Sequence, residues 1–382
     1  MGCEQMNTYV FVTNYYNHHQ AFFAREMDKQ TEHRFYFIET KQMSEERKKM
    51  GWGQEQKPSY VLQSYLNPET KRKCENLIKN ADVVIWGSCP FSMIRQRLKK
   101  KKITFAYSER IFKKGYHGFE FWGRAIKYFL RLALYQKNHY LLCASAYAAS
   151  DYEKIGLFRN RTFKWGYFPE MKQYDLDKLF IQKDNNKRSS ILWVARLIEL
   201  KHPEAVILLA EGLKEKGYLF DIDLIGNGVL ESKIKTMIEE RDLGDCVHML
   251  GAMSPREVRT HMEKTNIFLF TSDQNEGWGA VLNESMNSGC AVVANRSIGS
   301  VPFLIEHGVN GLLYQSQQDL QDRVEELLKE PVWCRKIGTM AYQTIVEEWN
   351  AKAAVSNFLK LINSDMNVIG RIQTGPCSEA KA

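Results

Sequence analysis

The sequence predicts an α/β protein with two Rossmann-like domains that face a cleft. Short apolar runs alternate with helix-length segments in both halves of the 382-residue chain, which is the pattern of parallel βαβ units. A polar stretch over 182–189 separates the halves and is typical of an interdomain linker. We therefore expect a first domain over 1–181 and a second over 190–350.

Apolar runs in the first half are expected to form buried strands. They are Tyr9–Thr13, Arg34–Ile38, Val83–Gly87, Ile103–Tyr107 and Leu141–Ala144. Helical patterns begin near Gln20 and Phe91, and another ends near Ile155. Since no glycine-rich dinucleotide fingerprint occurs here, the pattern argues against a dehydrogenase.

The second half has clearer helix signals. After a strand at Ile191–Val194, Pro203 favours the first turn of a helix that Gly217 ends. The next strand ends in Gly226-Asn227-Gly228. Ser254-Pro255-Arg256-Glu257 is a capping box with proline in the first turn, so another helix begins there.

The most informative stretch is SDQNEGWGAVLNESMNSGCAVVAN, from Ser272 to Asn295. An apolar run leads into a loop with one carboxylate and two glycines, and the helical segment that follows carries a second carboxylate. In a parallel sheet such a loop lies at the carboxyl end of a strand, where ligands bind. Glycines let the backbone approach a ligand, free N–H groups at a helix start favour an anion, and carboxylates can grip hydroxyls. Phosphate and polyol recognised together suggest a nucleotide sugar.

Bulk composition is that of a globular protein, with 44% hydrophobic and 26% charged residues. No apolar stretch has membrane-spanning length, and the amino terminus has no basic segment ahead of an apolar core, so we expect no secretory signal. Eight cysteines occur without a C-x-x-C pair. This pattern favours a reduced cytosolic protein with structural thiols.

The net charge of +8 is concentrated in two segments, 95–102 and 121–137. The second segment places Arg124, Lys127 and Arg131 on one face of an amphipathic helix. One interpretation is a solvated helix face over a core. The other is docking on an anionic membrane surface, as a lipid-linked acceptor would require. Nucleic acid is not an expected partner, because these clusters lack the interleaved aromatics of a known binding module.

The spacing Glu276-x7-Glu284, with glycines after the first Glu and Ser288-Gly289 after the helix, resembles the retaining glycosyltransferases of family four. The resemblance covers roughly Thr8 to Ile362. It implies the GT-B fold, in which a carboxy-terminal helix crosses back onto the first domain. Residues 351–365 are amphipathic and fit that helix, whereas 366–382 lack periodicity and are expected to be disordered.

The residues after the first strand of the second domain suit a diphosphate. Arg196 offers a planar fork of donors and Lys201 a mobile ammonium, and together they can stabilise the leaving nucleoside diphosphate. The resemblance assigns the same role to this pair. It further implies that Glu276 contacts the transferred sugar and that Glu284 contacts the ribose.

The resemblance also implies a backbone cradle for the donor. The backbone of Gly277, Trp278 and Gly279 would face phosphate, the turn at Gly226 and Asn227 would lie near the nucleotide, and Gly251 and Met253 would hold the base. The chain departs from the family pattern at Ser300, where a glycine is usual, and at Phe303, where a glutamate is usual.

Candidate residues of the first domain follow two of its strands. His18 and His19 can donate to phosphate or shuttle a proton, although a histidine pair in a polar loop is more often simply exposed. Glu109 can bind or deprotonate the acceptor, and Arg110 can pair with Glu109 or with phosphate; a structural ion pair is the alternative. The strings NHHQ, SERIFKKGY and WGYFPE resemble a bacterial subgroup of capsule and exopolysaccharide glycosyltransferases.

We therefore expect a glycosyltransferase that moves a sugar from a nucleoside-diphosphate sugar to a glycan or lipid-linked glycan, with no further cofactor. No catalytic metal is expected, since Asp221 and Asp223 lie inside an apolar strand. The alternatives are a nucleotide-sugar epimerase or a pyridoxal-phosphate phosphorylase on the same fold, and a non-catalytic partner of a membrane or polysaccharide assembly.

Overall fold

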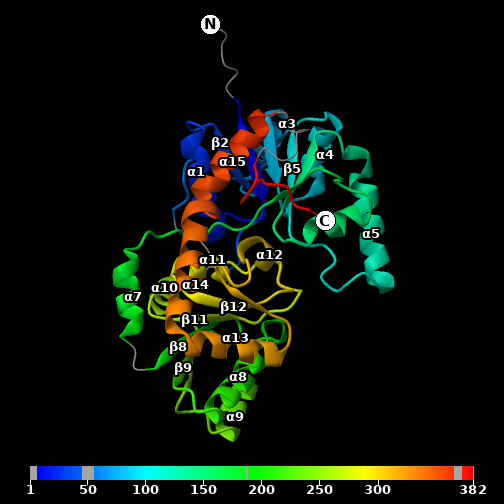
Figure 1. Cartoon of the computed structure of the whole chain (residues 1–382). Coiled ribbons are helices and arrows are strands. Elements are labelled where there is room, and N and C mark those ends of the chain that lie inside the picture. Colours follow the sequence, from blue (N-terminus) through cyan, green and yellow to red (C-terminus); the bar gives the residue numbers. More distant parts are fainter. Residues whose placement is uncertain (1–6, 45–55, 186–187, 365–371, 382) are drawn as a thin grey trace. The chain divides into compact units, whose positions relative to one another are not determined.

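The computed structural model describes residues 7–44, 56–185, 188–364 and 372–381, and these residues form two compact α/β units (Figure 1). The first unit contains the described residues up to Pro169 and those from Ala351 onward. The second unit is Glu170–Asn350. Each unit is a parallel sheet with its own helices, so the predicted pair of Rossmann-like domains is confirmed.

The first unit is built on a seven-stranded parallel sheet in the order β3-β2-β1-β4-β5-β6-β7. Its strands are β1 (Tyr9–Thr13), β2 (Phe35–Glu39), β3 (Val61–Gln63), β4 (Val83–Trp86), β5 (Thr104–Ser108), β6 (His139–Cys143) and β7 (Thr162–Lys164). The five predicted strands are confirmed, whereas β3 and β7, with only three residues each, were too short to predict. The strand order reverses between β1 and β4: the chain first adds β2 and β3 on one side of β1 and then adds β4 to β7 on the other side.

Helices cover this sheet, and the last of them returns from the end of the second unit. They are α1 (His18–Gln30), α3 (Pro68–Asn80), α4 (Phe91–Lys99), α5 (Gly118–Leu132), η1 (Ala133–Tyr135), α6 (Ala148–Glu153) and α15 (Ala351–Asn363). Helix α15 packs beside α1, and its Phe358 ring contacts Phe105 of β5 at 5.0 Å (Figure 1).

The second unit is built on a six-stranded parallel sheet in the order β10-β9-β8-β11-β12-β13. Its strands are β8 (Ser189–Val194), β9 (Phe220–Ile225), β10 (Val247–Gly251), β11 (Ile267–Phe270), β12 (Ala291–Asn295) and β13 (Leu312–Tyr314). The order switches between β8 and β11. Buried Ile, Leu and Val side chains from these strands fill the core of the unit.

The helices of the second unit follow the predicted signals. They are α7 (Leu176–Asp184), η2 (Glu199–Lys201), α8 (Pro203–Glu215), α9 (Glu231–Glu240), α10 (Pro255–Met262), α11 (Val281–Asn287), α12 (Val301–Leu304), α13 (Gln317–Lys329), α14 (Pro331–Gln343) and η3 (Thr344–Glu348). The capping box at the start of α10 is confirmed, because Ser254 and Glu257 satisfy each other's backbone N–H. No helix of the described residues is both long and apolar enough to cross a membrane.

The structure corrects the position of the domain boundary. The chain enters the second unit after Pro169, ahead of the polar stretch at 182–189 that we interpreted as a linker. Residues 182–184 belong to α7, and Lys183 of this helix is buried, with its ammonium donating to the carbonyls of Met262 and Thr265. The linker prediction assumed that the polar side chains of this stretch face water. The Lys183 ammonium instead donates to buried backbone carbonyls, so a polar residue lies inside the unit.

The structure also corrects the expectation of disorder for 366–382, as far as 372–381 are concerned; the other residues of that stretch lie outside the described residues. Cys377 and Ala380 are buried, and both donate their backbone N–H to β7, at 2.8 Å and 3.0 Å. Lys164 of β7 donates back to Ser378 at 2.8 Å. The segment is ordered because an edge strand offers a row of unpaired backbone groups, whatever the side chains of the segment that meets it.

Candidate functional site

The first candidate site lies in the second unit, where the strand order switches. Arg196 and Lys201 follow β8, and Glu276 lies in the loop after β11. Because β8 and β11 are neighbouring parallel strands, these loops meet at the same edge of the sheet. Ligands of open α/β sheets bind at this kind of edge.

Lys201 and Glu276 form an ion pair, with about one-seventh of each side chain exposed (13% and 14%). Ser272 also donates to the Glu276 carboxylate, at 3.2 Å. Below the pair, Trp193 of β8 donates to the hydroxyl of Thr271 at 2.8 Å, and that hydroxyl donates to the carbonyl of Lys201 at 2.6 Å. A buried tryptophan thus anchors the backbone that carries the lysine.

Arg196 is exposed, and its guanidinium has no hydrogen-bond or ion-pair partner among the described residues. Its loop is held by the turn at Gly226-Asn227-Gly228, since Leu197 donates to the Asn227 carbonyl at 2.8 Å. Gly226 has φ +144°, and a Cβ on it would lie 1.8 Å from the Ala195 carbonyl oxygen. Only glycine permits this approach, so the turn sets the position of the Arg196 loop.

Glu284 lies in the first turn of α11 and makes no side-chain hydrogen bond or ion pair within the described ranges. Removal from water raises the pKa of this carboxyl, while the charge of Arg259 opposes the shift. The Arg259 guanidinium is itself fixed by the Glu170 carbonyl at 2.9 Å and the Asn287 amide oxygen at 2.9 Å. The Glu284 carboxyl is therefore an acceptor that no donor of the described residues occupies.

The glycine loop before α11 encloses a buried tryptophan. Trp278 is fully buried, donates from Nε1 to Asn283 at 2.9 Å, and packs on Trp349 at 5.9 Å. Its side chain is therefore structural. Gly279 has φ +75°, and a Cβ there would lie 2.4 Å from the Phe270 ring.

The two departures from the family pattern have a structural explanation. Ser300 is buried and donates its hydroxyl to the Trp278 carbonyl. Phe303 stacks on Trp349 at 6.0 Å with an angle of 17° between the rings. A glutamate at 303 would place a carboxylate beside two aromatic rings, so this chain uses the position for packing beneath the loop.

Gly251 and Met253 follow β10. Gly251 has φ +73° and accepts from the Gly226 N–H at 2.8 Å, so the two glycine turns are hydrogen-bonded to each other. Met253 is half-buried. The structure thus brings the predicted base-binding segment beside the predicted nucleotide turn.

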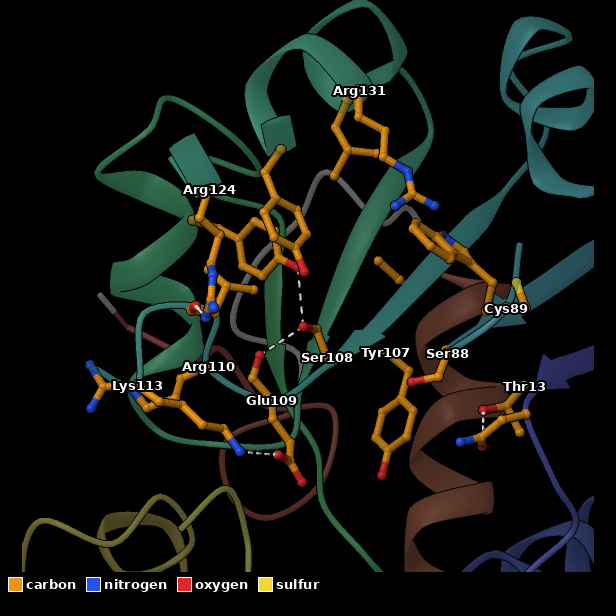
Figure 2. A pocket seen from close by; sticks show the side chains of 18 of the residues that line it. Thr13, Ser88, Cys89, Tyr107, Ser108, Glu109, Arg110, Lys113, Arg124 and Arg131 are labelled. Atoms are coloured by element: carbon orange, nitrogen blue, oxygen red, sulfur yellow. Dashed lines mark hydrogen bonds and ion pairs between the residues drawn. The ribbon is translucent and has the colours of Figure 1, made fainter. Parts of the chain in front are cut away.

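A second candidate site is a cavity of about 1070 Å³ in the first unit. The loops that follow β1, β4 and β5 line it, at the point where the strand order of that sheet switches, and α5 lines one side. Figure 2 shows Thr13, Ser88, Ser108 and Arg131 around this cavity. Its lining contains six Lys and Arg side chains and only Glu109 and Glu120 as acids, so the cavity favours an anionic ligand.

Glu109 and Arg110 lie in this cavity but do not pair with each other. The Glu109 carboxylate accepts from Lys113 at 2.7 Å (Figure 2). It also accepts from the Tyr167 hydroxyl at 2.7 Å. Arg110 instead pairs with buried Asp151 at 3.3 Å and lies over the Tyr147 ring. Arg110 therefore forms a structural ion pair, although its partner is Asp151 and not Glu109. Glu109 keeps about a third of its side chain in solvent (31%).

His18 and His19 begin α1, and Asn17 caps the helix by accepting from the Gln20 N–H. The His19 ring stacks on Tyr167 at 5.6 Å with an angle of 6°. Burial, together with the neighbouring His18, lowers the pKa of His19 to about 3. His19 is therefore neutral at physiological pH and suits hydrogen bonding better than proton donation as an imidazolium.

The described residues contain no group of three or more His, Cys, Asp or Glu arranged to hold a metal ion. The carboxylates of Asp221 and Asp223 are paired with Arg188 at 3.2 Å and with His261 at 3.4 Å. Metal independence itself stays a prediction.

Sequence reasoning missed the cavity wall formed by α5 and the support from Arg259. The basic face of α5 was recognised, but its place beside the strand loops depends on tertiary packing. Arg259 carried no signal, since a single arginine in an ordinary helix is usually exposed.

Comparison with known proteins shows a likeness between the second unit and a described family. Residues 177–344 match the model of the family described as glycosyl transferases group 1. The amylovoran biosynthesis glycosyltransferase AmsK of Erwinia amylovora is 38% identical over 128 residues, which are 32% of this chain and 31% of that protein. The poly(ribitol-phosphate) alpha-N-acetylglucosaminyltransferase of Staphylococcus aureus is 28% identical over 175 residues, 45% of this chain and 34% of that protein. The chain thus spans about a third of the length of these relatives.

Solved structures match nearly the whole chain. Anabaena Alr3699/HepE in complex with UDP superposes with a TM-score of 0.70 at 14% identity, covering 94% of this chain and 100% of that one. TarM superposes with a TM-score of 0.66 at 12% identity, covering 95% and 100%. Likeness at this identity shows the fold alone. The chain therefore has the two Rossmann-like domains of the GT-B fold, and residues 177–344 of its second unit are similar to the family described as glycosyl transferases group 1.

Proposed function

We propose that this protein is a retaining, metal-independent glycosyltransferase that moves a hexosyl group from a nucleoside-diphosphate sugar to a carbohydrate acceptor. The observation that carries the proposal is the position of Arg196 and of the Lys201–Glu276 pair at the switch between β8 and β11, inside the matched domain. Cations at this edge suit a diphosphate, and the carboxylates suit sugar hydroxyls.

In this mechanism the diphosphate leaves and the acceptor hydroxyl attacks from the same face of the sugar. A leaving-group oxygen takes the proton of the acceptor hydroxyl, so no protein nucleophile is required. The protein positions the reactants and stabilises the charge that grows on the diphosphate. Lys201 is already paired with Glu276, whereas Arg196 has no carboxylate partner in the described structure, so Arg196 supplies the larger uncompensated charge.

The other donor contacts follow from the loops. The unpartnered Glu284 carboxylate would accept from the ribose hydroxyls, and Glu276 would contact the transferred sugar. The backbone around Gly277 and Gly279 would face the phosphates. The hydrogen-bonded glycine turns at Gly226 and Gly251 would lie beside the nucleoside.

We assign the acceptor to the cavity of the first unit, where Glu109 would bind or deprotonate the acceptor hydroxyl. The two bacterial relatives described above are named for amylovoran biosynthesis and for transfer of N-acetylglucosamine to poly(ribitol phosphate). These names support a role in bacterial capsule, exopolysaccharide or other surface-glycan synthesis. The cysteines of the described residues are free thiols, which supports a location in the reducing cytoplasm, where nucleotide sugars are made.

Calorimetry with UDP, GDP, ADP and CMP, each with and without EDTA, tests the donor site. We expect saturable binding of one diphosphate that EDTA does not change. Arg196→Ala should weaken this binding and lower kcat/KM for transfer about a hundredfold or more, since removing one such charge costs a few kcal/mol in the transition state.

Arg188→Ala is the matched control, because Arg188 belongs to the same domain but pairs with Asp221 at 3.2 Å. It should leave donor binding unchanged. Near-normal turnover of Arg196→Ala would refute the phosphate assignment. Absence of diphosphate binding by the folded wild-type chain would instead favour a non-catalytic partner.

A further inference from the structure

Helix α5 presents a row of large apolar side chains to solvent. The exposed fractions are 97% for Phe119, 62% for Trp122, 55% for Ile126, 47% for Phe129 and 72% for Leu130. In the described residues, every large aromatic side chain that is strongly exposed, tryptophan included, lies on this helix. Contiguous exposed apolar surface of this kind marks a binding face.

The helix has three distinct faces, set by the 3.6-residue period. Ala125 and Leu132 are buried against the unit, and Tyr128 packs on Tyr152 at 5.8 Å. A second face carries Glu120, Arg124, Lys127 and Arg131 along the wall of the 1070 Å³ cavity (Figure 2). The apolar row occupies the remaining face, and none of its five side chains lines the cavity. Burial of the unit's own core therefore does not account for it.

Charge around the apolar face decides between possible occupants. Residues 95–137 contain thirteen Lys and Arg but only two Glu. The excess of basic over acidic residues in this segment alone is larger than the net charge of +8 of the whole chain. Arg97 does not contribute to the surface, because its guanidinium is buried on backbone carbonyls. Lys99, Lys100 and Lys101 are exposed beside α5, with Asn138, which follows the helix, donating to the Lys101 carbonyl at 2.8 Å. A second copy of this chain would bring like charge to like charge, whereas an anionic surface is complementary.

We propose that the apolar face of α5 inserts into the headgroup region of an anionic lipid bilayer and brings the basic cavity to the level of the lipid phosphates. An interfacial helix buries its apolar side chains about 5–10 Å below the surface, with cations at the headgroups. Arg124, Lys127 and Arg131 belong to the same helix, so the cavity opens where the phosphate of a lipid-linked acceptor lies. This assignment rests on the proposed transfer reaction and specifies its acceptor as an anionic lipid-linked glycan.

Sedimentation with phosphatidylcholine vesicles, with and without phosphatidylglycerol, tests the proposal on the full chain. The wild type should bind the anionic vesicles, with an affinity that falls as salt is raised. Leu130→Asp should weaken binding about tenfold or more, because it places a charge within the inserted face. Phe119→Ser should also weaken it, and since Phe119 is 97% exposed this change leaves the fold intact. Val332→Asp, at a site that is 83% exposed in the second unit, is the matched control and should bind like the wild type.

The outcomes separate the docking surface from the reaction. Leu130→Asp should keep the diphosphate affinity and the transfer rate to a water-soluble acceptor, and lose transfer only to an acceptor embedded in vesicles. Equal binding of wild type and Leu130→Asp, or equal binding to neutral and anionic vesicles, would overturn the proposal. So would a wild-type dimer in light scattering that Leu130→Asp dissociates, because the face would then join two copies. If vesicle binding behaves as expected while no diphosphate binds, the proposed reaction fails and the docking surface stands.

Discussion

Charged residues of the donor site differ in whether the protein already supplies their partners. Lys201 is neutralised by Glu276, whereas Arg196 and Glu284 have no side-chain partner in the described part of the chain. Holding the desolvated Glu284 carboxyl without a partner costs stability, and a ligand that pairs with it recovers that cost, whereas the exposed Arg196 bears no such cost. An unpaired, desolvated carboxyl is expected of a binding site, since stability alone would favour pairing it.

Glu284→Gln tests this cost through its dependence on pH. Burial raises the pKa of Glu284 above its ordinary value of 4.5, so the folded state binds the proton more tightly than the unfolded state. The associated stability is present below pH 4.5 and is lost as pH rises through the raised pKa. Glu284→Gln should therefore be more stable than the wild type at neutral pH, by an amount that shrinks toward pH 4.5.

Urea unfolding of both proteins without nucleotide, from pH 4.5 to neutrality, measures this difference. The same variant should bind the donor nucleotide about tenfold more weakly, because one charged hydrogen bond is replaced by a neutral one. A stability difference that does not vary with pH would contradict the assignment of an ionised, unpaired carboxylate.

At the scale of elements, both sheets place their candidate residues in loops at the switch in strand order. In the second unit the close fit is between the Ala195–Leu197 loop and the turn at Gly226-Asn227-Gly228. Gly228 also approaches this loop closely, with a Cβ position 2.4 Å from the Leu197 carbonyl oxygen. Backbone atoms make this contact, so neither partner can move aside by a change of rotamer.

Gly226→Ala should therefore displace the loop that carries Arg196. We expect a loss of diphosphate affinity of about tenfold or more, because a misplaced donor loses most of a charged hydrogen bond. Calorimetry measures the affinity, and thermal unfolding measures the accompanying loss of stability. Gly244→Ala is the control, since a Cβ there meets nothing within 4 Å. Normal affinity of Gly226→Ala would show that the turn does not position Arg196.

At the scale of the whole molecule, two buried histidines make the stability of the first unit sensitive to acid. The first unit contains His19 and His139, and burial lowers the pKa of each to about 3. His139 is fully buried and accepts a hydrogen bond from Trp86 at 3.1 Å. Their contribution to stability is fully present above pH 6.5 and is lost as pH falls from there toward 3.

His139→Gln should remove one of these titrations from the first unit. The slope of unfolding free energy with pH, between 6.5 and 3, should decrease by up to about 1.4 kcal/mol per pH unit. Urea unfolding across that range gives the slope. An unaltered slope in His139→Gln would mean that this histidine is not buried in its neutral form.

The sequence by itself determined the two-sheet architecture and the positions of the loops that we propose as the donor site. Apolar runs, the proline at the start of α8 and the glycines around Arg196 and Glu276 are local signals, and each acts within a few residues of the structure it predicts. The residues of this loop set were therefore predictable without knowing any long-range contact.

Tertiary structure alone decided which polar residues are exposed and which segments are ordered. Lys183 looked like part of a linker and Arg97 like part of a basic patch, but both are buried on backbone carbonyls from distant segments. Residues 372–381 lack any periodicity, yet they are held by the free edge of β7. The same limit applies to α5, whose basic face was evident but whose place beside the cavity was not. In each case the deciding partner lies far away in sequence, and unpaired backbone groups accept such partners with little regard for the local side-chain pattern.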